Sequence, residues 1–192
     1  NYELGYKTTF ANGRARANLA LFQMDYEDMQ ISATSNLPGV GDNTSKANLG
    51  SATISGFELE LTALVGDNLR LGLNLGVLDD EIDSFKGTLV SSGITLSKSN
   101  DLPFTPDYTV ALTAAYDIPL ENGAGITLRA DYSMKDDYYS RTENIPEVLE
   151  KDHRILNVSA RYFSPGDKWE AGVIVRNATA EFYFQSRSIF SA

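Results

Sequence analysis

Few residues of this sequence could take part in chemical catalysis. His153 is the only histidine and follows Asp152, and the chain contains no cysteine. A histidine that acts as a general base needs a nucleophile beside it, and no Gly-x-Ser-x-Gly or similar motif is present. Without cysteine there can be no disulfide, thiol nucleophile or cysteine-bound metal. We therefore expect His153 to be a solvated loop residue, and we expect that the protein is not an enzyme.

Acidic side chains are the other candidates, as ligands of a hard cation such as Ca²⁺. They cluster at residues 25–28, 79–83 and 136–137. None of these clusters has the spacing of an EF-hand or of another calcium-binding repeat, so we predict no metal site and no cofactor. The net charge of −10 removes any electrostatic basis for binding nucleic acid.

The elements that position these residues are predicted to be strands, because apolar residues recur at every second position. Residues 2–10 alternate in this way, and Asn12-Gly13 then marks a hairpin turn. The alternation changes phase near Phe22, which predicts a β-bulge there. The pattern continues from residue 15 and recurs at residues 57–65, 69–77, 108–118, 126–134, 156–162 and 169–175. These make eight strands, with a possible ninth at residues 182–190.

The connections between these strands alternate in length. Tight turns fall near residues 12, 67, 122 and 165, and long polar loops cover about 32–51, 79–106 and 140–153. Short turns on one rim and long loops on the other are typical of outer-membrane barrels, as are aromatic residues near strand ends. No apolar run is long enough for a transmembrane helix.

The charged residues agree with a barrel that has a wet interior. Lys7, Arg70, Arg129 and Arg161 all lie on the polar phase, where they avoid a cost of about 2–4 kcal/mol for a base that faces lipid. We predict an all-β, antiparallel, up-and-down transmembrane β-barrel. A soluble β-sandwich gives the same alternation and remains the alternative for this pattern.

Several longer motifs resemble the C-terminal barrel of TonB-dependent receptors. Residues 1–7 match a strand that reads N-Y-E-x-G-x-K in that family, and residues 22–30 match its F-x-x-D-Y-x-D-x-Q strand. A strand start of the form G-x-E-x-E occurs at residues 56–60, and residues 102–106 approximate a proline-rich strand entry.

The last motif of this resemblance lies near the C-terminus. Residues 176–183 match R-N-L-T-D-E-x-Y except at Ala178 and Ala180. Each motif alone is short, and it is their order and spacing over nearly the whole chain that carry the resemblance.

The resemblance implies that residues 1–192 are one barrel segment of about eight or nine strands. It would come from a barrel of about 22 strands filled by an N-terminal plug. The plug and its TonB box are not in this chain. The implied function is energy-coupled uptake of a siderophore, a cobalamin-like cofactor or an oligosaccharide across a Gram-negative outer membrane. Implied partners are outer-membrane lipid, TonB acting through the plug, and the small-molecule nutrient. Ligand contacts would come from the long loops and upper lumen, at Phe85, Phe104, Tyr138, Tyr139 and Arg141.

Two alternatives of other classes stay open. Eight strands can close a small barrel by themselves, which would make this a self-contained outer-membrane protein with a structural or adhesive role. A soluble, carbohydrate-binding β-sandwich would instead bury Leu69, Leu71, Leu73 and Leu75 inside protein.

Overall fold

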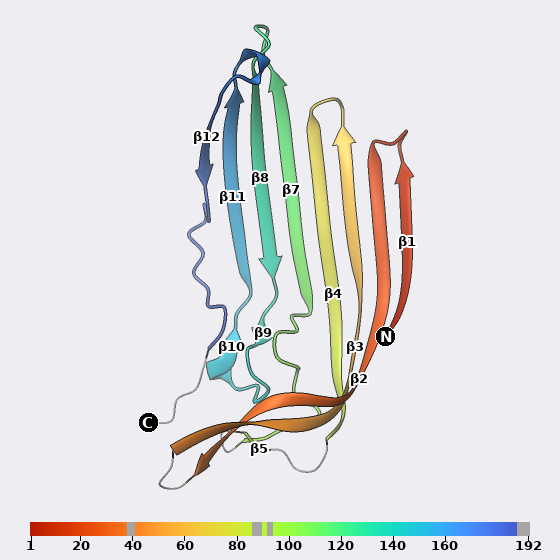
Figure 1. Cartoon of the computed structure of the whole chain (residues 1–192), viewed down its shortest axis with the longest axis vertical. Helices are drawn as coiled ribbons and strands as arrows, with labels where there is room; N and C mark the ends of the chain where they lie inside the picture. The colour runs from red at the N-terminus through yellow and green to blue at the C-terminus, as the bar shows by residue number, and fades with distance from the viewer. Residues whose placement is uncertain (38–40, 86–89, 92–93, 188–192) are drawn as a thin grey trace.

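The computed structural model describes residues 1–37, 41–85, 90–91 and 94–187. Eight strands form one antiparallel sheet in which each strand pairs with the next along the chain (Figure 1). In order they are β1 (Tyr2–Phe10), β2 (Ala15–Leu37), β3 (Gly41–Val65), β4 (Leu69–Phe85), β7 (Tyr108–Pro119), β8 (Gly125–Lys135), β11 (His153–Phe163) and β12 (Glu170–Val175). The all-β antiparallel, up-and-down class predicted from the alternation is confirmed.

Two small hairpins and two short 3₁₀ turns complete the described elements. The hairpins are β5 (Val90–Ser91) with β6 (Ile94–Thr95), and β9 (Tyr138–Tyr139) with β10 (Leu149–Glu150). The turns are η1 (Pro146–Val148) and η2 (Pro165–Asp167). No helix within the described ranges is long and apolar enough to cross a membrane.

The large sheet is open, with β1 at one edge and β12 at the other. A closed eight-stranded barrel would pair these two strands, so the self-contained small barrel is wrong for this chain. The sheet is also a single layer, whereas a sandwich needs a second sheet packed on its apolar face. Leu71, Leu112 and Leu128 on that face are 41–45 % exposed, so no protein layer covers them.

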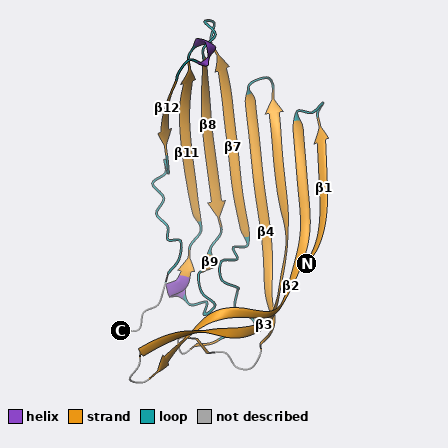
Figure 2. Ribbon diagram, viewed as in Figure 1, coloured by secondary structure: helices purple, strands orange, loops and turns teal. Residues whose placement is uncertain are grey.

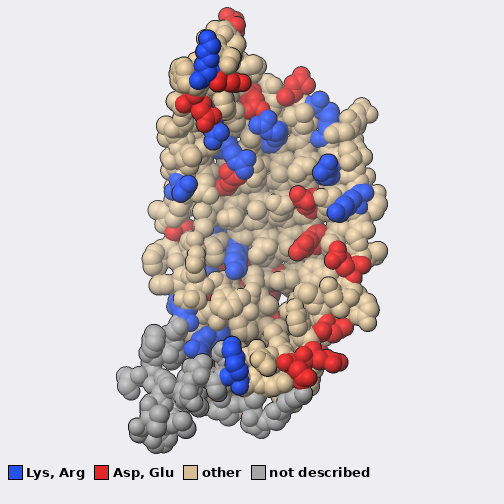
Figure 3. All heavy atoms as spheres, viewed as in Figure 1, with Lys and Arg blue, Asp and Glu red and all other residues tan. Residues whose placement is uncertain are grey.

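The strand register separates the two faces of the sheet. Lys7 pairs with Asn18, Asn18 with Glu60, and Glu60 with Asn74, so polar side chains stand together on one face. The next row of paired residues across the strands places leucines on the other face, among them Leu19, Leu59 and Leu75. We call the polar side the lumenal face and the apolar side the outer face. Figure 3 shows acidic and basic side chains interleaved over the strands.

The turns are short at one end of the sheet and the connections are long at the other (Figure 2). At the short end, Asn12 and Gly13 both take positive φ, 55° and 83°, as the tight turn after β1 requires. At the long end, the loop predicted at 32–51 is wrong within the described residues, and the loop predicted at 79–106 begins later than expected. β2 and β3 remain paired as a hairpin out to Leu37 and Gly41, and β4 continues to Phe85. These residues are polar because they belong to strand ends that extend beyond the apolar part of the outer face. Residues 38–40 of the loop predicted at 32–51 lie outside the described residues.

The phase change at Phe22 is not a bulge. The register of β2 with β3 is regular through Tyr26, and the irregularity lies between Tyr26 and Gln30. At this height the apolar side chains change face. Phe22 points to the lumenal side, where its ring would lie 3.0 Å from a Cβ at Gly56, while Gln23 takes the outer side.

An apolar core forms at the long-loop end of the sheet. Its buried members are Ile31, Leu49, Ala52, Ile82, Leu96 and Leu102, with Phe85 packed against them. The end of the β2–β3 hairpin sweeps across this end of the sheet in Figure 1, and Ile31 and Leu49 seat it on the loop residues Leu96 and Leu102.

The possible ninth strand does not form within residues 182–187, and residues 188–190 lie outside the described part of the chain. The ladder ends after Val175, where Asn177 and Ala180 take positive φ, 48° and 54°. The segment then continues as irregular chain beside the start of β11.

Candidate functional site

A hollow of about 730 Å³ lies on the lumenal face at mid-height of the sheet. Its floor crosses six strands, β1, β2, β3, β4, β7 and β8, and reaches the first residue of β11. Small side chains make the space, because the positions that would otherwise fill it are Gly5, Ala20, Gly76, Thr109 and Ala111.

Charged side chains lie at both ends of this hollow. Glu58 and Glu60 lie on β3, and the amide of Asn18 donates to Glu60 at 2.7 Å. At the far end, Lys135 of β8 pairs in register with His153 of β11.

Lys135 and His153 both lie against aromatic rings. The Lys135 ammonium sits 3.9 Å from the centre of the Tyr138 ring, and Lys135 forms no ion pair within the described residues. The His153 ring stacks on Tyr183 with centroids 4.3 Å apart and planes 4° apart. The His153 Nδ1 atom is buried and has no hydrogen-bond partner. The expectation that His153 is merely a solvated loop residue is wrong, because it opens β11 and is half-buried.

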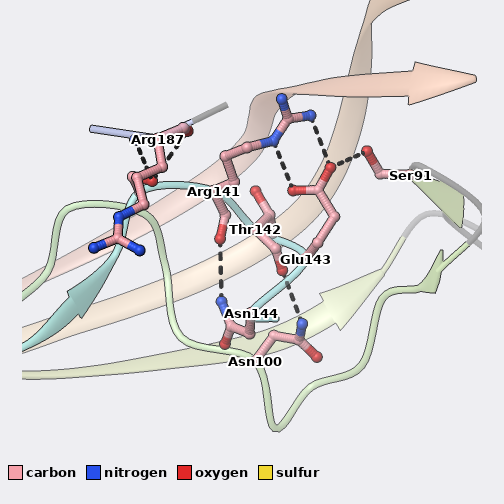
Figure 4. Close-up of polar contacts among 8 residues, drawn as sticks. Ser91, Asn100, Arg141, Thr142, Glu143, Asn144 and Arg187 are labelled. Atoms are coloured by element: carbon pink, nitrogen blue, oxygen red, sulfur yellow. Dashed lines mark hydrogen bonds and ion pairs between the residues drawn. The ribbon is translucent and has the colours of Figure 1, made fainter. Parts of the chain in front are cut away.

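At the long-loop end of the sheet, next to the hollow, the long connections form a layer that buried polar groups hold together (Figure 4). The Arg141 guanidinium donates to both oxygens of Glu143, at 2.8 and 3.1 Å, and the Ser91 hydroxyl donates to Glu143 at 2.6 Å. The Glu143 side chain is 1 % exposed. Burial raises the pKa of this carboxyl, but the hydrogen bonds from Arg141 and Ser91 outweigh burial and hold the pKa below its ordinary value.

The same layer ties the C-terminal segment to the sheet. The Arg187 guanidinium lies 3.4 Å from the buried carboxylate of Glu150. The backbone N–H of Arg187 donates to the Ser140 hydroxyl at 3.2 Å. The Tyr138 hydroxyl donates to the carbonyl of Gln185 at 3.0 Å. Burial, together with Glu150 and Tyr183, raises the pKa of Tyr138. These contacts hold Tyr183 in place over His153.

Two asparagines join the loop after β6 to the loop after β9. Asn100 donates to the carbonyl of Thr142 at 2.8 Å (Figure 4). Asn144 donates to the carbonyl of Asp101 at 3.1 Å. Segments more than 40 residues apart in the sequence are thereby fixed side by side.

The structure brings together three of the five residues predicted to contact ligand, Phe104, Tyr138 and Tyr139. The N–H of Phe104 donates to the carbonyl of Tyr139 at 2.9 Å, and the Phe104 and Tyr138 rings lie 5.9 Å apart. Phe104 is 53 % exposed, whereas Tyr138 is buried. Arg141 follows in the same loop and is held by Glu143. Phe85 is separate from them, at the end of β4 against the apolar core.

Sequence reasoning missed Lys135, Glu143, Glu150 and Arg187. The signal for Lys135 was its position on the polar phase at the end of a strand. The two glutamates gave no sequence signal, because their burial depends on how separate loops pack.

The acidic clusters do not form a metal site in the described structure, where no three His, Cys, Asp or Glu side chains are arranged to hold an ion. Two loop carboxyls nevertheless have raised pKa values. Burial raises the pKa of Asp101 and of Asp107, and the nearby carboxylates of Asp80 and Asp137 raise both further.

Comparison with known proteins decides the family. The model of the "TonB dependent receptor-like, beta-barrel" family matches residues 1–178. The chain belongs to this family. The resemblance seen in the sequence motifs is thus confirmed, and the family is one of receptors rather than enzymes.

Solved structures of TonB-dependent receptors share the fold. The ferric yersiniabactin uptake receptor FyuA from Yersinia pestis superposes with a TM-score of 0.72 at 21 % identity, over 95 % of this chain and 25 % of that one. The siderophore receptor PiuA from Acinetobacter baumannii gives 0.69 at 20 % identity, over 95 % and 24 %. The ferric preacinetobactin receptor BauA, also from Acinetobacter baumannii, gives 0.67 at 19 % identity, over 94 % and 25 %. The chain spans about a quarter of the length of these receptors.

Proposed function

We propose that this chain is part of the barrel wall of an outer-membrane receptor that takes up a ferric siderophore. The observation that carries the proposal is the family match over residues 1–178. Three structural neighbours with this sheet are named as receptors for siderophores or ferric chelates, which favours that substrate class over a cobalamin-like cofactor or an oligosaccharide.

The two faces of the sheet support a place in the outer membrane. Leucine, valine and tyrosine side chains cover the outer face from the short turns to about Leu21, Phe57 and Val77, and polar side chains replace them beyond. Side chains that face lipid in such barrels form an apolar band of this kind. The lumenal face stays polar, which suits a water-filled or plugged interior.

Ligand capture is assigned to the loop layer and the upper lumen. Phe104 contacts Tyr138 and Tyr139 there, and Arg141 follows in the same loop. Phe85 packs instead against the apolar core at this end of the sheet. No bond is made or broken in this function. Energy would reach the receptor from TonB through a plug, and this part of the wall would supply loops and lining.

Uptake by the full-length receptor tests the proposal. A strain that lacks the receptor gene should lose growth on, and radiolabelled iron uptake from, at least one ferric siderophore, and a plasmid copy should restore both. A receptor whose loss leaves every ferric siderophore usable, while uptake of cobalamin or an oligosaccharide fails, would contradict the siderophore assignment.

A further inference from the structure

The β2–β3 hairpin bends where it leaves the sheet. β3 pairs with β4 as far as Gly50, and beyond this residue β2 and β3 continue as a hairpin that pairs with itself. We call residues 29–37 and 41–49 the distal hairpin. In Figure 1 the distal hairpin crosses the long-loop end of the sheet instead of continuing along the direction of the strands.

Both strands carry a left-handed residue at the bend. Asp28 of β2 has φ of 56°, and Gly50 of β3 has φ of 124°. Gly50 pairs with Met29, and the register of the two strands shifts on both sides of Met29. Such irregularities bend a strand and interrupt its ladder, and a hinge consists of a few residues that absorb changes in φ and ψ. The bend therefore has the form of a hinge.

The distal hairpin lies on the lumenal side of the sheet. Ala52 shares its phase of β3 with Glu58 of the hollow, so Ala52 faces the lumen. Ala52 is fully buried, and the apolar cluster around it includes Ile31 and Leu49 of the distal hairpin. The distal hairpin therefore covers the lumenal face at the long-loop end.

Apolar contacts with a loop hold the hairpin in this position. Leu49 is fully buried, and the same cluster contains the loop residues Leu96 and Leu102. Leu102 is itself fixed, because its N–H donates to the Asp80 carboxylate at 2.7 Å. We call the packing of Ile31 and Leu49 with Leu96 and Leu102 the latch.

The closed position leaves one polar atom of the distal hairpin unpaired. Asn48 Nδ2 donates to the Asp28 carboxylate at 3.2 Å. Asn48 Oδ1 is buried and has no hydrogen-bond partner within the described residues. Burial of an unpaired polar atom costs free energy, which opening would return by exposing the atom to water. The latch and this cost act in opposite directions, as they must in an element with two positions.

We propose that the distal hairpin is a lid that rests closed over the lumenal face, turns about Asp28 and Gly50, and must release its latch before a ligand reaches the hollow. This inference rests on the proposed siderophore uptake and adds a step that regulates access to the lumen. Because both sides of the latch belong to this chain, closure needs no contact with the ligand.

A cysteine under the lid tests whether the hairpin opens. Ala52→Cys in the full-length receptor places a thiol beneath the latch, where a bulky maleimide added to intact cells reaches it only when the lid is open. The receptor without this cysteine is the blank. Leu49→Ala removes a latch side chain and should speed labelling of Ala52→Cys at least about tenfold. Leu59→Ala is the matched control on the outer face of the same strand, far from the latch, and should change labelling by less than about twofold.

Hydrogen exchange distinguishes a lid that turns as one body from a hairpin that unfolds. In Leu49→Ala, the amides of the β2–β3 ladder between residues 30 and 48 should exchange as slowly as in the wild-type receptor, although labelling is faster. Exchange that accelerates as much as labelling would show that the hairpin unfolds, and would overturn the hinge. Labelling that Leu49→Ala does not accelerate would overturn the latch.

The association rate of a ferric siderophore tests whether the lid controls access. The probe is the ferric siderophore that a strain lacking the receptor cannot use. Its association rate should rise in Leu49→Ala by about the same factor as labelling, because both rates follow the fraction of open receptor. Faster labelling with an unchanged association rate would overturn the control of access. If no ferric siderophore binds while labelling still responds to Leu49→Ala, the proposed function fails and the lid stands.

Discussion

The side chain of Asn177 pairs with the backbone of Glu181 at both of its polar atoms. Asn177 Nδ2 donates to the carbonyl of Glu181 at 2.8 Å, and Asn177 Oδ1 accepts from the N–H of Glu181 at 2.9 Å. The N–H of Asn177 is itself held at 2.9 Å by the Asn157 side chain. This arrangement ends β12 and turns the chain so that Tyr183 reaches His153. It accounts for the asparagine of the motif at residues 176–183, because both bonds need an amide side chain at position 177.

Asn177→Ala should release the segment from residue 177 to residue 187. The substitution leaves the N–H and carbonyl of Glu181 without their partner, at a cost of about 1–3 kcal/mol. Amide hydrogen exchange in residues 178–187 should become at least several-fold faster, while exchange in β7 and β8 stays as it was. Asn74→Ala is the control, because the Asn74 side chain makes no hydrogen bond within the described residues. Equal exchange rates in the two variants would show that the hydrogen bonds of the Asn177 side chain do not hold residues 177–187 in place.

Gly50→Ala should disrupt the base of the β2–β3 hairpin. Gly50 has φ of 124°, which L residues rarely adopt, and an added Cβ would lie 2.1 Å from the Ser84 carbonyl oxygen. Backbone cannot move aside as a flexible side chain can, so we expect a loss of at least about 2 kcal/mol. The share of barrel that stays folded in cold SDS should fall. Gly66→Ala, in a turn where φ is 59° but nothing lies within 4 Å, should cost less. A Gly50→Ala protein as resistant as Gly66→Ala would refute the clash.

The strands were predictable from sequence because each side chain shows its face through the period of two. The face change at Phe22 was misread as a bulge for the same reason. Alternation reports which phase is apolar but not whether the apolar phase faces lipid or a packed interior. At the loop end the apolar phase packs on the core around Leu49 and Ile82, and the outer face becomes polar.

The site was less predictable than the fold. The exposed aromatic residue Phe104 could be proposed from its place in a long loop. The buried pairs Arg141–Glu143 and Glu150–Arg187 could not, because they join segments whose packing is decided by tertiary contacts. His153 was undervalued because its partner Tyr183 lies 30 residues away in a segment where a further strand was expected.

Leu112→Arg should block assembly into the membrane. Leu112 is on the outer face of β7, paired with Leu73 and Tyr132, and is 44 % exposed in this sheet. An arginine that faces lipid near mid-depth costs about 2–4 kcal/mol. The neighbouring Ala111→Arg places the same side chain in the lumenal hollow and should assemble close to normally. Comparing the amounts of folded protein in outer-membrane fractions checks both. Poor assembly of Ala111→Arg with normal assembly of Leu112→Arg would mean that the faces are reversed.

Glu143→Gln should loosen the loop layer in a pH-dependent way. The folded-state pKa of Glu143 is lowered by Arg141 and Ser91, so its contribution to stability is fully present above the ordinary glutamate pKa of about 4.3 and is lost as the pH falls through the lowered value. At pH 7 the variant loses the bidentate pair with Arg141, which we expect to destabilise the layer by about 1–3 kcal/mol. Local opening can be followed by the rate at which a protease cuts the loop between β9 and β10. The variant should be cut faster at pH 7, and the ratio of the two rates should fall toward one as the pH drops below the lowered pKa of Glu143, measured there with an acid-active protease. A ratio that stays constant until the whole protein unfolds in acid would show that the Glu143 carboxylate does not hold this loop through its charge.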